Sequence, residues 1–341
     1  MLQRSDHLSY IPQSLDSAYS IIESELKDVE QILREELSDR DTFVDEVVRY
    51  AFQLGGKRLR PALLLLVAKS LGSVTREHLL LATAIEMIHT ATLIHDDILD
   101  GALFRRHLQT MNLKWDANIS VMAGDYLLAK AMEIVTKLDD IQPYRILSTA
   151  CRKTCYGELF QQGTRARFDL TANEYDLMIA SKTAALLESA CHLGAILATD
   201  NVSTIEAFRF FGKNLGMAFQ IIDDLLDLVG DESQTGKTLG TDLAQKKPTL
   251  PLILYLESLT SEDRKVAVEA MDRCSRVPDD VAGMIEQMRR SGSLDAAKNH
   301  AALLVDQAVE RLESVPESEF SFSDAVQTLL TVARFVVERT I

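Results

Sequence analysis

Apolar residues recur about every three to four positions along most of the chain, which is the spacing of helices with one buried face. Glycine, proline and short polar stretches separate these segments. No low-complexity segment and no linker between two cores interrupts the series. The pattern predicts an all-α fold, a single-domain bundle of antiparallel helices over residues 1–341, with residues 1–14 flexible. Helices are expected over residues 15–35, 42–54, 62–71, 77–100, 119–138, 144–163, 174–198, 203–230, 250–256, 261–274, 279–291, 294–312 and 323–339.

Two similar acidic motifs lie inside apolar helices, at residues 95–100 (HDDILD) and 222–227 (IDDLLD). The first and last aspartates of each motif are one helical turn apart, so they share one helix face about 6 Å apart along the axis. A single motif of this kind is usually a solvated helix face. Two of them with apolar flanks favour Mg²⁺ and phosphate oxygens, because burying so many carboxylates without cations is costly. The predicted metal ligands, with the middle aspartate of each motif in support, are Asp96, Asp97, Asp100, Asp223, Asp224 and Asp227.

Basic residues gather at a few places, although the chain has 36 Lys and Arg against 51 Asp and Glu and a net charge of −15. Residues 55–61 (GGKRLRP) place a glycine turn and three cations at a helix start, where free N–H groups and the helix dipole also favour phosphate. Arg105 and Arg106 follow the first acidic motif and are suited to gripping a diphosphate. The alternatives are a basic surface turn and a solvated arginine pair.

Three further features carry candidate phosphate ligands. His89 precedes the first motif by two helical turns, although a histidine within a helix is more often a core residue. Lys182 and Thr183 lie among small residues that let a ligand approach the backbone, although such a lysine also reaches solvent easily. Residues 235–249 form a break in the helical rhythm with Lys237 and Lys247, and they are expected to be a flap over the diphosphate rather than a plain linker.

The composition excludes several function classes. The acidic balance argues against nucleic-acid binding. Four cysteines without metal-ligand spacing or a disulfide framework indicate reduced thiols and a cytoplasmic protein. No signal peptide and no membrane-spanning segment is expected. Neither a Walker phosphate loop nor a dinucleotide-binding glycine motif is present, so the chemistry that remains is metal-assisted ionisation of a diphosphate, with an apolar cavity that protects a carbocation from water.

From about residue 45 to the C-terminus the chain resembles the trans-type (E) isoprenyl diphosphate synthases, most closely their long-chain members. Both acidic motifs contribute to this resemblance, together with several companion segments in the same order. These segments are residues 55–61, 86–97, 157–161, 182–183, 219–227, 236–237, 242–243 and 247–251. The resemblance implies the isoprenoid synthase type I fold, with helices around a central cavity.

The resemblance also implies roles. An allylic prenyl diphosphate ionises, the double bond of isopentenyl diphosphate attacks the cation, a proton is lost and the cycle repeats. The implied catalytic residues, acting with three Mg²⁺ ions, are Asp96, Asp100, Asp223, Lys182 and Arg105. The residues expected to hold the allylic diphosphate are Arg105, Lys182, Lys237 and Lys247, with Gln220 near it. Those expected to hold isopentenyl diphosphate are Lys57, Arg60, His89 and Arg106. Gly56 and Thr183 are further expected substrate-binding residues.

Three positions depart from the family pattern: His107 and Lys246 replace usual glycines, and Gln109 replaces a usual proline. They lie beside the expected ligands, so activity is expected to survive. In this family the residues four and five positions before the first aspartate line the floor of the chain tunnel. Here they are Thr92 and Ala91, whose small side chains leave room for a long product that feeds quinone side chains.

Other functions stay open at this point. A geranylgeranyl, farnesylgeranyl or farnesyl product is the alternative within the same enzyme class. A class I terpene cyclase would normally keep one aspartate motif, and a non-catalytic subunit of a heteromeric synthase would usually have lost aspartates that are present here. A homodimer is expected from the resemblance alone.

Overall fold

The helical series predicted from the sequence is present in the computed structural model, which describes residues 19–54, 56, 58–230, 239–274 and 278–338. The expectation for residues 1–14 lies outside this part. The helices are η1 (Tyr19–Ile22), α2 (Glu23–Glu36), α3 (Thr42–Gln53), α4 (Leu59–Leu71), α5 (Arg76–Leu99), α6 (Met111–Lys114), α7 (Ala117–Val135), α8 (Gln142–Gly163), α9 (Ala172–Ile179), η2 (Ala180–Ala184), α10 (Ala185–Ile196), α11 (Val202–Val229), α13 (Thr241–Ala244), α14 (Leu250–Ser258), α15 (Ser261–Cys274), α16 (Pro278–Ser291), α17 (Ser293–Glu313), η3 (Glu317–Glu319) and α18 (Ser323–Glu338).

Two local features were not expected. The helix predicted over residues 174–198 is divided, because η2 is a single π-helical turn between α9 and α10. A small antiparallel hairpin, β1 (Phe104–Arg105) and β2 (Leu108–Gln109), follows α5. The two residues that join these strands both have positive φ, as in the type I′ turns that suit the twist of a hairpin. Apolar periodicity carries no signal for either feature.

The core lies where α4, α5, α10 and α11 pack together. Helix α4 is apolar around its circumference, and Leu63–Ala68 are fully buried. A helix that is hydrophobic on all sides needs neighbours on all sides, and α5, α10 and α18 provide them. The residues shared by these helices form one hydrophobic cluster, so the described part of the chain is a single bundle. Its helices do not include one long and apolar enough to cross a membrane.

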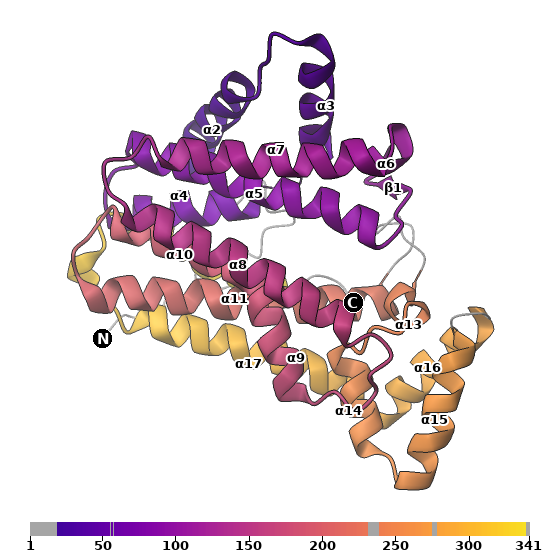
Figure 1. The fold of residues 1–341 in the computed structure, drawn as a ribbon. Helices are drawn as coiled ribbons and strands as arrows, with labels where there is room; N and C mark the ends of the chain where they lie inside the picture. The colour runs from indigo at the N-terminus through magenta and orange to yellow at the C-terminus, as the bar shows by residue number, and fades with distance from the viewer. Residues whose placement is uncertain (1–18, 55, 57, 231–238, 275–277, 339–341) are drawn as a thin grey trace.

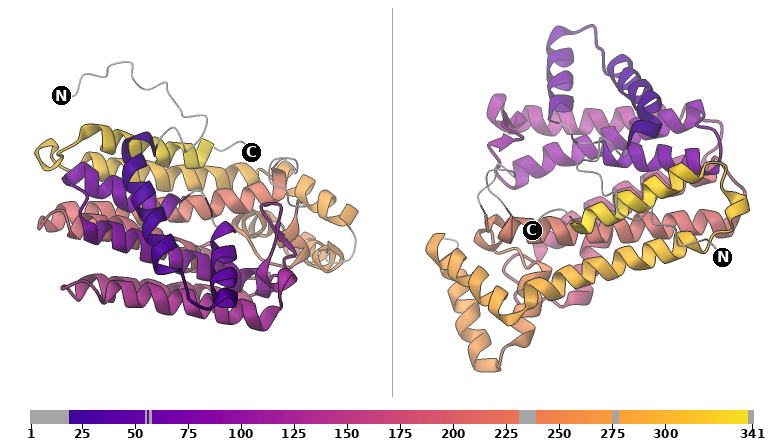
Figure 2. Two further views of the ribbon diagram at one scale, coloured as in Figure 1. Left: turned by 90° about the horizontal axis from the view of Figure 1, so that it is seen from above. Right: turned by 180° about the vertical axis from the view of Figure 1, so that it is seen from behind.

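The bundle places both acidic motifs at the same side of the molecule. Figure 1 shows α5 and α11 running through the bundle with their C-terminal ends next to β1 and α13. The pair α2 and α3 projects from one side of the bundle, whereas α15 and α16 project from another (Figure 2). The site is therefore built at one end of the central helices.

Candidate functional site

The first acidic motif forms the last turn of α5. Asp96 is half-buried, and this burial raises the pKa of its carboxyl group to about 6. Asp100 is the exposed C-cap, and its Oδ1 accepts from Lys247 Nζ at 3.0 Å and from Arg165 Nη2 at 3.2 Å. Residues distant from the motif in sequence thus converge on one carboxylate. Lys247, which the sequence analysis placed in a flap over the diphosphate, contacts the first acidic motif. Arg165 was not among the predicted site residues.

The middle aspartate of this motif has a different role. Asp97 is 4% exposed and accepts from Arg105 Nε at 3.0 Å and from Arg105 Nη2 at 2.9 Å. The β1–β2 hairpin folds back over the end of α5 and brings Arg105 into this position. Because its oxygens are engaged by a guanidinium fork, Asp97 is suited to supporting the site rather than to ligating a metal. The sequence analysis likewise predicted a supporting position for Asp97, within the set of metal ligands.

The second acidic motif lies at the end of α11 and shows the same division of roles. Tyr175 Oη on α9 donates to buried Asp224 at 2.6 Å, and Gln220 Nε2 donates to the same carboxylate at 2.7 Å. Burial raises the pKa of Asp224 above its usual range. Asp227 accepts from the backbone N–H of Asp242 at 3.0 Å. Asp223 and Asp227 stay on the half-buried face, while Asp224 anchors the helix to its neighbours.

Lys182 lies on the π-helical turn η2, opposite α8. Its Nζ contacts Glu158 Oε2 at 2.5 Å and donates to Gln161 Oε1 at 2.7 Å. The charges of Asp96 and Glu158 outweigh burial and hold the pKa of Lys182 above its usual value. A π-helical turn is a common feature of functional sites because it redirects one side chain out of the helical register. The charges of Asp96 and Asp100 act on Lys182, so this lysine lies near the first acidic motif.

Thr183 and Gln220 also lie together. Thr183 Oγ1 donates to Gln220 Oε1 at 2.6 Å, which joins η2 to α11. Gln220 is therefore oriented at both ends, since its amide nitrogen donates to Asp224. The pair connects the lysine on η2 with the second acidic motif.

The second group of cations is separate from the lysines. Arg60 and His89 are half-buried and come from α4 and α5, while Arg106 lies on the hairpin turn. Burial and the charges of the surrounding arginines, Arg60 first among them, hold the pKa of His89 well below its usual value. Arg106 Nη2 lies so close to Gly56 that a Cβ there would be 3.0 Å from it. These residues form an electropositive group with a neutral histidine, which suits an anionic ligand.

Two of the predicted phosphate ligands, Lys57 and Lys237, lie outside the described residues. The two predicted tunnel positions are on α5, where Ala91 is buried and Thr92 is half-buried. Thr92 Oγ1 donates to the carbonyl of His89 at 2.7 Å, so its polar atom is satisfied within the helix. Ala91 belongs to the hydrophobic core, one turn below the acidic motif.

The donor set fits Mg²⁺, which prefers a few carboxylate oxygens and completes its octahedron with water and phosphate oxygens. Asp96, Asp100 and Asp223 are the carboxylates that the sequence predicts as its ligands, whereas Asp97 and Asp224 accept from Arg105 and Tyr175. Within the described ranges, no group of three His, Cys, Asp or Glu side chains could hold a metal ion by itself. Water and phosphate oxygens would complete the octahedron of an ion held by these carboxylates.

Sequence reasoning did not assign roles to several residues of this site. Glu158 and Asp242 lie in segments that carry the family resemblance, and they form ion pairs with Lys182 and Lys247. No sequence pattern indicated a role for Tyr175 or Arg165. Each reaches its aspartate only through the packing of α9 and of the segment after α8.

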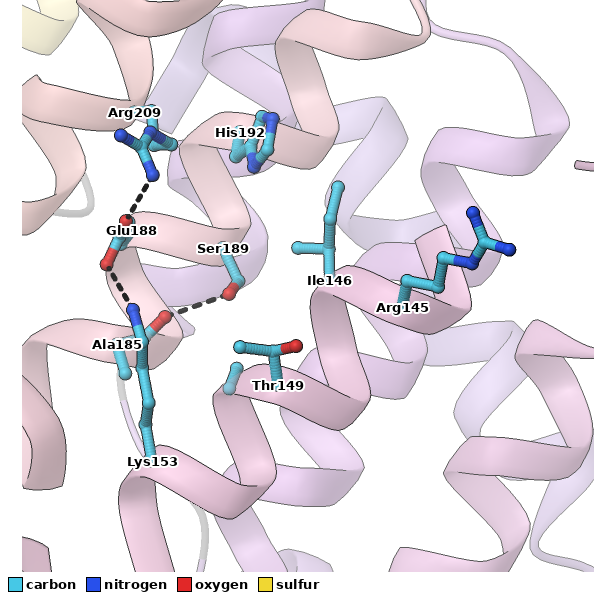
Figure 3. Close-up of a pocket in the computed structure, with 10 residues that line it drawn as sticks. Arg145, Ile146, Thr149, Lys153, Ala185, Glu188, Ser189, His192 and Arg209 are labelled. Carbon is cyan, nitrogen blue, oxygen red and sulfur yellow. Dashed lines mark hydrogen bonds and ion pairs between the residues drawn. The ribbon is translucent and has the colours of Figure 1, made fainter. Parts of the chain in front are cut away.

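A hollow lies away from the acidic motifs, between α8, α10 and α11 (Figure 3). It encloses about 260 Å³ and contains none of the predicted site residues. Glu188 lies between two cations there, 3.4 Å from Lys153 Nζ and 3.3 Å from Arg209 Nη1. Figure 3 shows these three side chains in one line, with Arg145 pointing away from them. Neither acidic motif lines this hollow, so it lacks the metal ligands expected at a diphosphate site.

The chain is similar to known proteins over most of its length. Residues 41–288 match the family model described as Polyprenyl synthetase. The chain is 37% identical to the short chain isoprenyl diphosphate synthase of Methanothermobacter thermautotrophicus, over 84% of this chain and 87% of that protein. It is 34% identical to the all-trans-nonaprenyl-diphosphate synthase (geranyl-diphosphate specific) of Rhodobacter capsulatus, over 91% and 94% of the two chains. The crystal structure of a polyprenyl synthase from Caulobacter crescentus CB15, complexed with calcium and isoprenyl diphosphate, matches with a TM-score of 0.88 and 32% identity, over 96% of this chain and 98% of that chain. The chain therefore belongs to the polyprenyl synthetase family and is a prenyltransferase with the all-α isoprenoid synthase type I fold.

Proposed function

We propose that the protein condenses isopentenyl diphosphate with an allylic prenyl diphosphate, head to tail and with trans geometry, to give a long-chain polyprenyl diphosphate. The observation that carries this proposal is the presence of two separate cation groups beside two acidic motifs at one end of the bundle. One group is centred on Lys182 and Lys247, and the other on Arg60 and His89. A reaction between two diphosphates needs two such anion sites.

The residues divide the work between the substrates. Lys182 and Lys247 lie on the aspartates of the first motif, so they are placed to hold the allylic diphosphate and to stabilise it as it departs. Three Mg²⁺ ions, bound through Asp96, Asp100 and Asp223, would supply further positive charge to the leaving group. Arg60, His89 and Arg106 would hold isopentenyl diphosphate with its double bond toward the allylic carbon. The proton lost after the attack passes to the departing diphosphate.

A long product is favoured over a short one by the two small residues below the first motif. Ala91 and Thr92 leave space for a growing chain, which a bulky ring there would fill. A heptaprenyl to decaprenyl product suits quinone side chains. The short-chain alternative is kept because the relatives include a protein named as a short chain isoprenyl diphosphate synthase as well as one that makes a nonaprenyl product.

The decisive assay incubates the protein with Mg²⁺, labelled isopentenyl diphosphate and farnesyl diphosphate, and sizes the dephosphorylated products by chromatography. A ladder that reaches heptaprenyl or longer supports the proposal in full. A stop at geranylgeranyl keeps the reaction and refutes the long product. No incorporation with any allylic primer favours a non-catalytic subunit of a heteromeric synthase, and a cyclic hydrocarbon formed without isopentenyl diphosphate favours a terpene cyclase.

Ala91→Phe tests the tunnel assignment directly. The larger ring fills the volume that the prenyl chain needs, so the product distribution shifts to shorter chains while the first condensation continues. Ala296→Phe, at an exposed position of α17, is the matched control and leaves the distribution unchanged. An unchanged product length in Ala91→Phe refutes the placement of the tunnel beside this residue.

We propose that the protein is a homodimer that uses the outer faces of α7 and α8. Large apolar side chains are exposed there, among them Met122 and Tyr126 on α7 and Tyr156 and Leu159 on α8. Exposed apolar patches of this kind often mark protein interfaces. Light scattering after size-exclusion chromatography checks the assembly, and Leu159→Glu shifts it toward the monomer. A wild-type monomer at micromolar concentration contradicts this part of the proposal.

We also propose the cytoplasmic location expected from the sequence. Free thiols at Cys151, Cys155 and Cys191 support it, because such cysteines persist in a reducing compartment. Fractionation of cells that express the protein checks this location.

A further inference from the structure

Arg58 begins α4 in an unusual conformation for a residue with a long side chain. Its φ of 52° and ψ of 33° lie in the left-handed region, where glycine is the residue expected. An arginine persists at such a position when the surrounding structure holds it there. The contacts of its side chain identify what holds it.

Two carboxylates from two other helices bind the Arg58 guanidinium. Its Nε contacts Glu30 Oε1 on α2 at 2.6 Å, and its Nη1 contacts Glu86 Oε1 on α5 at 2.7 Å. The Arg58 side chain is 18% exposed and that of Glu86 only 1%. The guanidinium also lies over the Phe52 ring, 5.8 Å from its centroid. The start of α4 is therefore tied to α2, α3 and α5 through one side chain.

The clamp formed by Arg58, Glu30 and Glu86 adjoins the electropositive group of the site. His89 follows Glu86 by three residues, so both side chains lie on the same face of α5. Arg60 follows Arg58 by two residues, and the charge of Glu86 acts on Arg60 as well. The buried Nε of Arg60 has no hydrogen-bond partner among the described residues, so it is available to an anionic ligand.

We propose that Arg58 is a positioning residue for isopentenyl diphosphate, because its clamp fixes the left-handed start of α4 that places Arg60 beside His89. This inference rests on the proposed function of Arg60 and His89. The two carboxylates neutralise Arg58, which leaves it as an anchor, whereas Arg60 keeps an unpaired donor, among the described residues, for the diphosphate.

The test measures steady-state constants for each substrate in Arg58→Gln and Glu86→Gln. Each change removes a charge and keeps most of the side-chain volume, so Arg60 loses its fixed position. The KM for isopentenyl diphosphate is expected to rise about tenfold, while kcat and the KM for farnesyl diphosphate stay within about twofold of wild type. Arg58→Lys keeps the charge but not the fork that reaches both carboxylates, and it gives an intermediate KM.

The chain offers a matched control at the other end of α4. Lys69 Nζ contacts Glu25 Oε1 at 2.5 Å and so joins α4 to α2 away from the site. Lys69→Met is expected to lower the melting temperature as much as Arg58→Gln without changing either KM. The positioning role is overturned if Arg58→Gln leaves the KM for isopentenyl diphosphate unchanged, or if both KM values rise together as in a general loss of structure.

Calorimetric binding of isopentenyl diphosphate to the wild-type protein separates failure of the clamp from failure of the proposed function. If the wild-type protein binds isopentenyl diphosphate and Arg58→Gln binds it with equal affinity, the clamp alone is overturned. An absence of wild-type binding and of turnover overturns the site assignment, and the positioning role with it. If the wild-type protein binds isopentenyl diphosphate and Arg58→Gln binds it about tenfold more weakly, both the site assignment and the positioning role are supported.

Discussion

Gly157→Ala tests how closely α8 must approach the turn that carries Lys182. A Cβ on residue 157 would lie 2.3 Å from the backbone nitrogen of Lys182, 2.7 Å from its Cα and 2.8 Å from its Cβ. Carbon atoms in van der Waals contact are about 3.5–4.0 Å apart, so the two backbones must separate by about 1 Å. This displacement acts on the helix turn that carries Glu158 and on the lysine that binds it.

The expected cost has a structural and a catalytic part. Overpacking a tight contact destabilises a protein by about 1–3 kcal/mol, and the better helix propensity of alanine returns about 0.5–1 kcal/mol. We therefore expect the free energy of unfolding to fall by about 1–2 kcal/mol. A shift of about 1 Å in a residue that holds the leaving group lowers kcat/KM for the allylic substrate by about a hundredfold. The KM for isopentenyl diphosphate is expected to change little, because its predicted ligands lie on other elements.

The assay combines urea unfolding with incorporation of labelled isopentenyl diphosphate at varied farnesyl diphosphate. Gly163→Ala is the control, because this exposed glycine ends the same helix and a Cβ added to it would meet no atom within 4 Å. That variant keeps full activity and wild-type or slightly higher stability. The reasoning is refuted if Gly157→Ala matches wild type in both stability and allylic kcat/KM.

Three further changes test other parts of the structure. His107→Gly removes the side chain from a residue with a positive φ of 65° in the exposed hairpin turn, so the free energy of unfolding is expected to rise by up to about 1 kcal/mol. Thermal unfolding measures this change, and a lower stability of the variant contradicts backbone strain at His107. Tyr175→Phe removes the donor to buried Asp224 and lowers the free energy of unfolding by about 1–3 kcal/mol; an unchanged urea midpoint contradicts the importance of this hydrogen bond. Burial lowers the pKa of His78, whose Nδ1 accepts from the Thr75 N–H, so the unfolded chain binds more protons and stability is lost as the pH falls below about 6.5. In His78→Gln, the midpoint of unfolding is expected to depend less steeply on pH between about pH 7 and 5. A pH dependence as steep as that of the wild-type protein contradicts His78 as its source.

The sequence determined the helical architecture because periodicity is a local property. Helix α11 was predicted over residues 203–230 and spans Val202–Val229. The capping box at the start of α9, in which Thr171 and Glu174 bind each other's backbone N–H, is likewise a local feature. The π-helical turn and the two-residue strands escaped this reading, because both depend on contacts with other segments.

The chemistry of the site was also largely contained in the residue types. Two aspartate motifs and several basic segments predicted a diphosphate site, and the bundle brings the described members of both to one end. The sequence predicted a supporting role for the middle aspartate of each motif, but it could not name the residue that each one would bind. Asp97 and Asp224 are occupied by Arg105 and Tyr175, and these pairings exist only after the chain has folded.

Tertiary structure alone decided which charges neutralise one another. Arg58 and Arg60 are two residues apart and chemically alike, yet one is held by Glu30 and Glu86 while the other keeps a buried donor without a partner among the described residues. The composition fixes how many charges the chain carries, and local patterns fix which helix face each one occupies. The partner of a charge depends on helices that are distant in sequence, since only their packing brings a carboxylate within reach.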